Sequence, residues 1–141
     1  MQIENFNTGG QGLAYNDLDT ANQGGQYRTS EGVDIEASTD TGGGYDVGWT
    51  AAGEWMNYTV NVTTAGTYTI NTRVASLGPG GTFHYNVDGV SATSEVTVVD
   101  TGGWANFMTL GTPITLTAGT HVIQLHMDAN GATGEIGRAH V

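Results

Sequence analysis

Residues 120–128 read THVIQLHMD, and apolar side chains recur there at every second position. Ile123, Leu125 and Met127 fall on one face, and more polar neighbours separate them. A period of two is typical of a β-strand with one buried face, because successive side chains of a strand point to opposite sides. The stretch therefore predicts a strand that packs one face against a core.

The same alternation recurs along the chain, and helical periodicity is nearly absent. Alternating stretches are TYTINTRVA (67–75) and TFHYNVDG (82–89), and further candidate strands are residues 33–37, 46–50, 56–62, 95–100 and 106–116. Turn sequences such as TAG, DG and TGG separate them. Many short strands joined by such turns predict an all-β fold, namely an antiparallel β-sandwich of the jelly-roll kind.

The first 40 residues are different, because they are polar, acidic and rich in glycine. We expect a short N-terminal strand followed by long loops, and loops of this kind often carry the function of a sandwich. The total length of 141 residues fits one domain. Met1 leads directly into QIENF without a visible signal peptide, so we expect a module excised from a longer protein.

The chain is strongly acidic, with 14 Asp and Glu against 3 Lys and Arg and a net charge of −11. Such a surface repels nucleic acid and anionic membranes, so we expect neither as a partner. It suits a neutral ligand or a divalent cation. The absence of cysteine excludes disulfides and thiolate metal sites.

No motif for catalysis is present. A glycosidase needs two carboxylates at a defined separation, and none of the 14 acids lies in a pattern that marks such a pair. His84 and His126 fall on polar faces of expected strands and are interpreted as surface residues. The loop DLDTANQGG (17–25) offers oxygen ligands for calcium at alternate positions, but it lacks the twelfth-position Glu of an EF-hand. A polar loop with an Asx turn is therefore favoured.

The aromatic residues carry the strongest functional signal. A sugar site needs aromatic rings that stack on the sugar, together with polar side chains for its hydroxyls. Tyr45 in TGGGYDVG and Trp104 in DTGGWANF lie on glycine-rich loops, outside the inward face of a regular strand. We interpret Trp49 and Trp55 as anchors on either side of the AAGE turn, and Tyr58 and Tyr68 as core residues.

Taken in order, these motifs resemble carbohydrate-binding module family six. The resemblance rests on IENFNTGGQGLAYNDLD, GGYDVGWTAAGEWMNYTVNV, GGTFHYNVDG, DTGGWANF and LTAGTHVIQLHMDANG, and it covers residues 1–134. It implies a jelly-roll sandwich that binds sugars in a cleft between loops, where a Tyr and a Trp enclose the sugar and a Glu and an Asn bind its hydroxyls. By motif the clamp is Tyr45 and Trp104, and the acid is Glu31, with Glu36 as the competitor.

The family Asn normally lies just before the last strand, in the segment that reads EIGRAHV here. Residues 135–141 resemble a translated sequencing adapter, so we expect a non-native tail without a strand and a missing last native strand. Asn130 lies too early to replace the family Asn. The resemblance also allows a second cleft on a sheet face near Glu54 and Trp55.

The resemblance further implies a structural calcium beside the N-terminal strand. By motif its ligands are Gln2, Glu4 and a loop carbonyl near Arg28, and a further Asp usually comes from the final strand.

The expected function is non-catalytic binding of a polysaccharide of the agarose, β-glucan or xylan type, which targets an appended glycoside hydrolase to its substrate. We expect a monomeric, extracellular module. Two alternatives stay open, namely a catalytic glycosidase domain and a cell-surface adhesion or structural module. The first predicts release of sugar products, and the second predicts an interaction without sugar.

Overall fold

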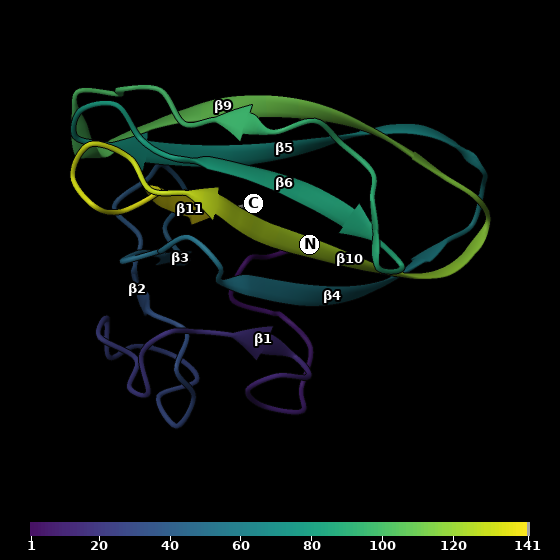
Figure 1. The fold of residues 1–141 in the computed structure, drawn as a ribbon, viewed down its shortest axis with the longest axis horizontal. Coiled ribbons are helices and arrows are strands. Elements are labelled where there is room, and N and C mark those ends of the chain that lie inside the picture. Colours follow the sequence, from purple (N-terminus) through teal and green to yellow (C-terminus); the bar gives the residue numbers. More distant parts are fainter. Residues whose placement is uncertain (141) are drawn as a thin grey trace.

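The computed structural model describes residues 1–140 and is built from two antiparallel sheets, without helices (Figure 1). One six-stranded sheet has the order β1 (Tyr15–Asn16), β4 (Trp55–Val62), β10 (Gly119–Ala129), β6 (Thr82–Val87) and β7 (Val90–Ser91), and β8 (Val96–Thr97) also pairs with β6. The five-stranded sheet has the order β2 (Ile35–Ala37), β3 (Tyr45–Val47), β11 (Arg138–His140), β5 (Gly66–Ser76) and β9 (Gly103–Leu116). The expected all-β jelly-roll sandwich is confirmed. In the described residues no helix is long and apolar enough to cross a membrane.

Strand β10 lies at the centre of the six-stranded sheet and pairs with both β4 and β6. Ile123, Leu125 and Met127 are buried between the sheets, as the alternation of the opening stretch predicts. The longest ladder joins β5 to β9 in the other sheet and runs from the pair Gly66–Leu116 to the pair Val74–Met108. These long ladders form the rigid frame on which the shorter strands are placed.

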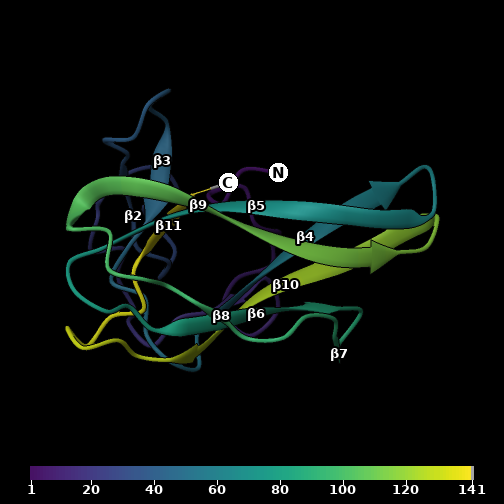
Figure 2. The same cartoon turned by 90° about the horizontal axis from the view of Figure 1, so that it is seen from above.

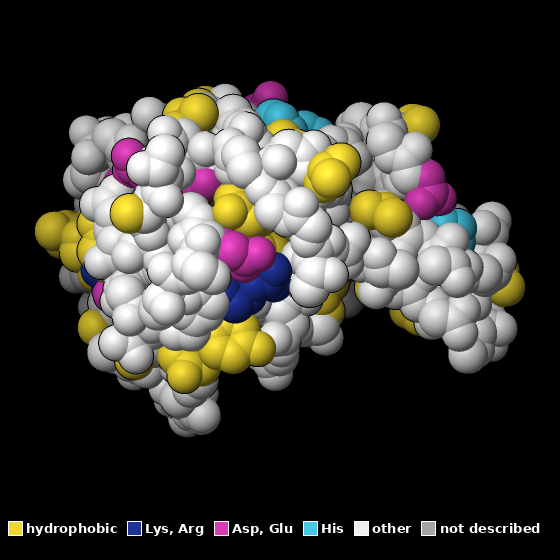
Figure 3. Space-filling view, turned by 90° about the horizontal axis from the view of Figure 1, so that it is seen from below, with side chains coloured by type: hydrophobic (Ala, Val, Ile, Leu, Met, Phe, Trp, Pro, Cys, Tyr) yellow, Lys and Arg dark blue, Asp and Glu magenta, His cyan; other side chains and the backbone are white. Residues whose placement is uncertain are grey.

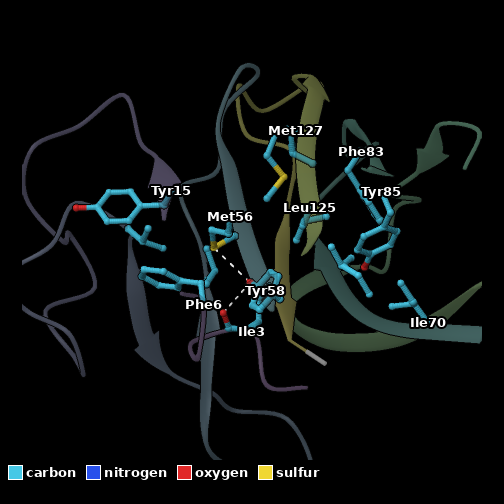
Figure 4. Close-up of a cluster of buried hydrophobic side chains, with 14 of the residues drawn as sticks. Ile3, Phe6, Tyr15, Met56, Tyr58, Ile70, Phe83, Tyr85, Leu125 and Met127 are labelled. Atoms are coloured by element: carbon cyan, nitrogen blue, oxygen red, sulfur yellow. Dashed lines mark hydrogen bonds between the residues drawn. The ribbon is translucent and has the colours of Figure 1, made fainter. Parts of the chain in front are cut away.

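Aromatic and aliphatic side chains from both sheets fill the core (Figure 4). The Tyr58 hydroxyl donates to the Ile3 carbonyl over 2.8 Å, which ties the N-terminal segment to β4. The Tyr85 hydroxyl is paired with the Thr72 hydroxyl over 2.7 Å, which joins β6 to β5 across the core. Both buried hydroxyls are therefore satisfied, as a stable apolar core requires. The prediction that Tyr58 belongs to the core is confirmed.

The first 40 residues form mainly loops, drawn in purple and dark blue below the sandwich in Figure 1. The expected N-terminal strand is not formed at residues 1–10, and the first strand is β1, of two residues. Side chains hold the loops instead: Arg28 donates to the Asn7 carbonyl over 2.9 Å, and the Tyr15 hydroxyl accepts the Gly32 N–H over 3.0 Å. These bonds satisfy backbone groups that have no strand partner.

Two expectations about the fold are wrong. Tyr68 is not a core residue, since 41% of its surface is exposed, and it lines an open groove between the end of β4 and the first half of β5, beside Met1 and Gln2. The segment after residue 134 does contain a strand, because β11 pairs with β3 on one side and with β5 on the other. Main-chain hydrogen bonds form this strand whatever the side-chain pattern, so periodicity does not reveal it. Whether residues 135–141 are native stays a prediction.

Candidate functional site

The side chains of Glu36, Trp49 and Trp104 meet that of Arg138 where β9 begins and β3 ends. Figures 1 and 2 show β2, β3 and β11 gathered at this end of the molecule. Glu36 of β2 lies opposite Asp46 of β3, and Trp49 follows two residues after β3. Arg138 begins β11, and Trp104 is the second residue of β9. The sheet thus brings together residues that lie up to a hundred positions apart.

The Arg138 guanidinium is the centre of this group. Its Cζ lies 5.5 Å from the centroid of the Trp49 ring and 5.5 Å from that of the Trp104 ring. Its Nη1 forms an ion pair with Glu36 Oε1. A guanidinium within about 6 Å of a ring centroid makes a favourable cation–π contact. The two indoles and the carboxylate therefore hold one flat polar group in common.

The backbone at Trp49 is unusual, because its φ is 50°. A bulky residue in the left-handed region is a true outlier that costs about 1–3 kcal/mol. Such strain persists where the surroundings impose it and is enriched at binding sites. The left-handed turn directs the indole of Trp49 toward Arg138 instead of continuing the alternation of β3.

A hydrogen-bonded turn positions Trp104. Gly102 and Gly103 precede it with φ values of 83° and 158°. The Asp100 carboxylate accepts the Gly102 N–H over 2.8 Å and the Gly78 N–H over 3.0 Å. Asp100 therefore joins the turn before β9 to the loop after β5. These bonds fix the position of Trp104 near the start of β9.

Glu36 has a perturbed acidity. Burial raises its pKa to about 7, the Arg138 charge opposes that shift, and Asp46 adds to it. A carboxyl with this pKa accepts hydrogen bonds when ionised and donates one when protonated. Near neutral pH Glu36 can thus accept a hydrogen bond from a ligand hydroxyl or donate one to it.

Tyr45 has a different aromatic neighbour. Its ring lies 5.1 Å from that of Tyr27, with an interplanar angle of 30°, and it also packs against the core. Tyr27 has a φ of 51°, and its hydroxyl donates to Asn5 Oδ1 over 2.8 Å. The structure therefore places Tyr45 beside Tyr27 in the N-terminal loops, whereas Trp104 has Arg138 as its partner.

Glu31 also lies in the N-terminal loops. It forms an ion pair with Arg28, whose Cζ lies 3.5 Å above the Phe6 ring. On the face shown in Figure 3, basic and acidic side chains lie side by side above apolar ones. Of the two acids considered for the sugar site, the structure thus brings Glu36 to Trp104 and keeps Glu31 at Arg28.

The expected calcium ligands differ in their surroundings. Glu4 is buried, and within residues 1–140 its Oε2 has no hydrogen-bond partner, which suits a cation ligand. Gln2 is exposed, and the Arg28 carbonyl accepts the Glu31 N–H over 3.1 Å. Of the three expected ligands, Glu4 is thus the one whose surroundings suit a cation, and the Arg28 carbonyl keeps a second lone pair.

The acidic loop of residues 17–25 is held by its own side chains. Asp17 Oδ1 accepts the Asp19 N–H over 2.8 Å, the bond of an Asx turn, and Asp34 Oδ1 accepts the Gln23 N–H over 2.6 Å. Burial raises the pKa of Asp17 to about 7, and nearby Glu54 adds to the shift. The favoured interpretation of this loop as an Asx turn agrees with these bonds.

The comparison with known families identifies the class of this module. The sequence profile of the family described as "Carbohydrate binding module (family 6)" matches residues 23–136. The chain belongs to this family. The module is therefore a non-catalytic binder of polysaccharides, and neither a catalytic domain nor an adhesion module is favoured.

Solved structures of the family share the fold of this module. It is 32% identical to a carbohydrate-binding module of Cellvibrio mixtus lichenase 5A in complex with cellotriose, with a TM-score of 0.65 over 77% of this chain and 81% of the other. It is 27% identical to a β-1,3-glucan-binding family 6 module of Bacillus halodurans, with a TM-score of 0.69 over 88% and 96%.

The curated relatives are much longer proteins. The module is 32% identical over 94 residues to beta-agarase AgaA of Microbulbifer thermotolerans, which covers 61% of this chain. It spans between 16% and 21% of the length of the curated relatives that it matches.

Two residues of the site were missed by the sequence analysis. Trp49 was interpreted as a strand anchor, because a Trp beside a strand is usually core. Its position directly after the glycine of DVGWT was the available signal. Arg138 was set aside with the tail, and no pattern in the sequence connects it to Trp104.

Proposed function

We propose that this module binds a β-linked glucan by stacking one sugar ring against Trp49 and Trp104, with Glu36 bonded to the sugar hydroxyls. The contacts of Arg138 carry this proposal. The guanidinium is flat and rich in donors, and it already touches two aromatic faces and one carboxylate. A pyranose ring offers flat C–H faces and hydroxyl donors, so the same three groups suit it.

The relatives support a choice of ligand class. One similar module was solved with cellotriose and another is described as binding β-1,3-glucan. We therefore take a β-1,3- or β-1,4-linked glucan as the ligand, and agarose as the second choice because of the agarase relative.

Affinity electrophoresis in gels that contain laminarin, barley β-glucan or agarose tests the site. The variants Trp49→Ala and Trp104→Ala should lose retardation in the gel that retards the wild type. Tyr68→Ala is the matched control, because Tyr68 is an exposed aromatic residue at the other end of β5, opposite Ile114. Normal retardation of both site variants, or loss in the control alone, would refute the site.

The larger protein and its setting are also part of the proposal. An appended glycoside hydrolase would gain effective substrate concentration from a tethered binding module. We propose an extracellular setting, in keeping with the polysaccharide ligand, and a monomeric module. Light scattering after size-exclusion chromatography tests the last point, and a stable dimer at micromolar concentration would contradict it.

We also propose a structural calcium ion held by Glu4, with the Arg28 carbonyl and Gln2 as further oxygen ligands. The buried, unpartnered Glu4 Oε2 supports it within the described part of the chain. Calcium should raise the melting temperature of the wild type by several degrees and that of Glu4→Gln much less. Glu95→Gln, at an exposed acid, should respond like the wild type. An equal response of all three proteins would contradict the site.

A further inference from the structure

The outer face of the six-stranded sheet carries a compact group of two histidines and one aspartate. His126 of β10 lies directly opposite His84 of β6 in the antiparallel register. Asp128 lies two residues beyond His126, so its side chain points to the same face. All three side chains belong to the two strands at the centre of the sheet and are thus held by a rigid frame.

The polar atoms of this group converge. His84 Nδ1 lies 2.8 Å from both carboxylate oxygens of Asp128, and His126 Nδ1 lies 3.3 Å from Asp128 Oδ1. The two imidazole rings are 5.1 Å apart between centroids, with an interplanar angle of 33°. The three side chains are only 16–30% exposed. One potential ligand atom from each lies within 4.8 Å of the others.

A chain of amides fixes the proton on His84. Gln124 donates to Asn57 Oδ1 over 3.1 Å and accepts from the Asn86 amide nitrogen over 2.9 Å. Asn86 therefore presents its Oδ1 to His84 Nε2, at 2.9 Å, and Nε2 must carry the hydrogen. His84 Nδ1 then faces the Asp128 carboxylate and is free of any other partner among the described residues.

The basic side chains are engaged away from this group. Arg28 pairs with Glu31, Arg73 with Asp40 and Arg138 with Glu36, each within the described residues, and the chain contains no lysine. Within the described residues, Asp128 therefore has only histidines as ion-pair partners. In a molecule with a net charge of −11, the overall field favours a divalent cation.

We propose that His84, His126 and Asp128 bind a divalent transition-metal ion of the zinc type. Two imidazole nitrogens and one carboxylate are a common ligand set for zinc, with bond lengths of about 2.0–2.2 Å. Ligand atoms around a tetrahedral zinc are then about 3.3 Å apart. The two contacts to Asp128, at 2.8 and 3.3 Å, are near this value, and all three ligand atoms lie within 4.8 Å of one another, so the side chains would close around the ion.

The surroundings complete such a site. Asn86 accepts the outer N–H of His84, which is the usual second contact of a metal-binding histidine and fixes the ring orientation. Three protein ligands leave the fourth position to water on the open face of the sheet. The site is independent of the proposed sugar site, which lies on the other sheet.

Titration calorimetry with zinc chloride tests the proposal on the whole chain. Excess calcium in the buffer occupies carboxylate sites that prefer hard cations. The heat of zinc binding then reports on the site that contains the imidazoles. The wild type should bind one zinc ion. His84→Ala, His126→Ala and Asp128→Asn should each weaken binding by at least about tenfold, and Asn86→Ala should weaken it by about tenfold. Circular dichroism verifies that each variant is folded.

His121→Ala is the matched control. His121 lies on the same strand and pairs with Asp88 over 2.7 Å at the other end of the sheet, without a second histidine. Figure 3 shows histidine atoms in two separate areas of the surface, in keeping with two groups. The control should bind zinc like the wild type. Absence of saturable binding to the wild type, or equal affinity of the wild type and the His84 and His126 variants, would overturn the proposal.

Discussion

At the scale of single residues, the site depends on features that periodicity does not reveal. The sequence indicates Trp104 and offers Glu36 as a candidate, and both contact Arg138 at the site that we propose. It pairs Trp104 with Tyr45, however, because both follow glycines. The partner in space is set by the left-handed φ of Trp49 and by the packing of β11 beside β3. A backbone outlier and a long-range pairing are properties of the fold, which explains why Trp49 was missed.

Arg138 competes with the sugar in our account, because it occupies the contacts that we assign to the ligand. Arg138→Ala should therefore bind glucan oligosaccharides more tightly than the wild type in titration calorimetry. Arg73→Ala is the control, since Arg73 lies on the same sheet but pairs with Asp40. Weaker binding of the Arg138 variant would show that the arginine belongs to the sugar site instead of blocking it.

At the scale of strands, alternation was a reliable guide where a strand is long and has one buried face. Residues 56–62, 67–75 and 120–128 match β4, β5 and β10 closely. It failed for β11, which has three residues and gains its stability from two neighbouring strands. It also misplaced Tyr68, because the alternation of β5 continues past the end of the core.

The segment before β11 should stabilise the sandwich. Ile136 is only 3% exposed, and its backbone pairs with Gly81 and Thr50. Ile136→Ala should lower the free energy of unfolding by about 2–4 kcal/mol, measured by urea denaturation. Val90→Ala, at a site with 69% exposure, should change it by less than about 0.5 kcal/mol. A negligible effect of the first variant would show that this segment is not part of the folded unit.

At the scale of the whole molecule, the acidic composition gives the net charge but not the position of the charges. Three buried carboxyls have raised pKa values, chiefly because of desolvation, namely those of Asp17 and Asp34 in the N-terminal loops and of Glu54 directly before β4. Each of them loses its proton more readily in the unfolded chain. Stability should therefore fall as the pH rises from about 4 to about 7.

Asp17→Asn tests this dependence in the presence of a chelator. The amide keeps the acceptor for the Asp19 N–H but cannot ionise. Because burial raises the pKa of Asp17 to about 7, the variant should be more stable than the wild type by about 1–2 kcal/mol at pH 8, after allowance for solvent screening. At pH 3 both side chains are neutral, so the difference should nearly vanish. A variant that is less stable than the wild type at pH 8 would contradict the origin of the shift.

The central claim is that Trp49, and not Tyr45, completes the sugar site with Trp104. Calorimetric titration of the Arg138→Ala protein with cellotriose and laminaritriose measures this most directly, when Trp49→Ala and Tyr45→Ala are compared in that background. An aromatic contact contributes about 1 kcal/mol beyond the buried area, so loss of Trp49 should weaken binding by at least about tenfold. Loss of Tyr45 should leave the affinity within about twofold. Retained affinity without Trp49 and lost affinity without Tyr45 would contradict the account.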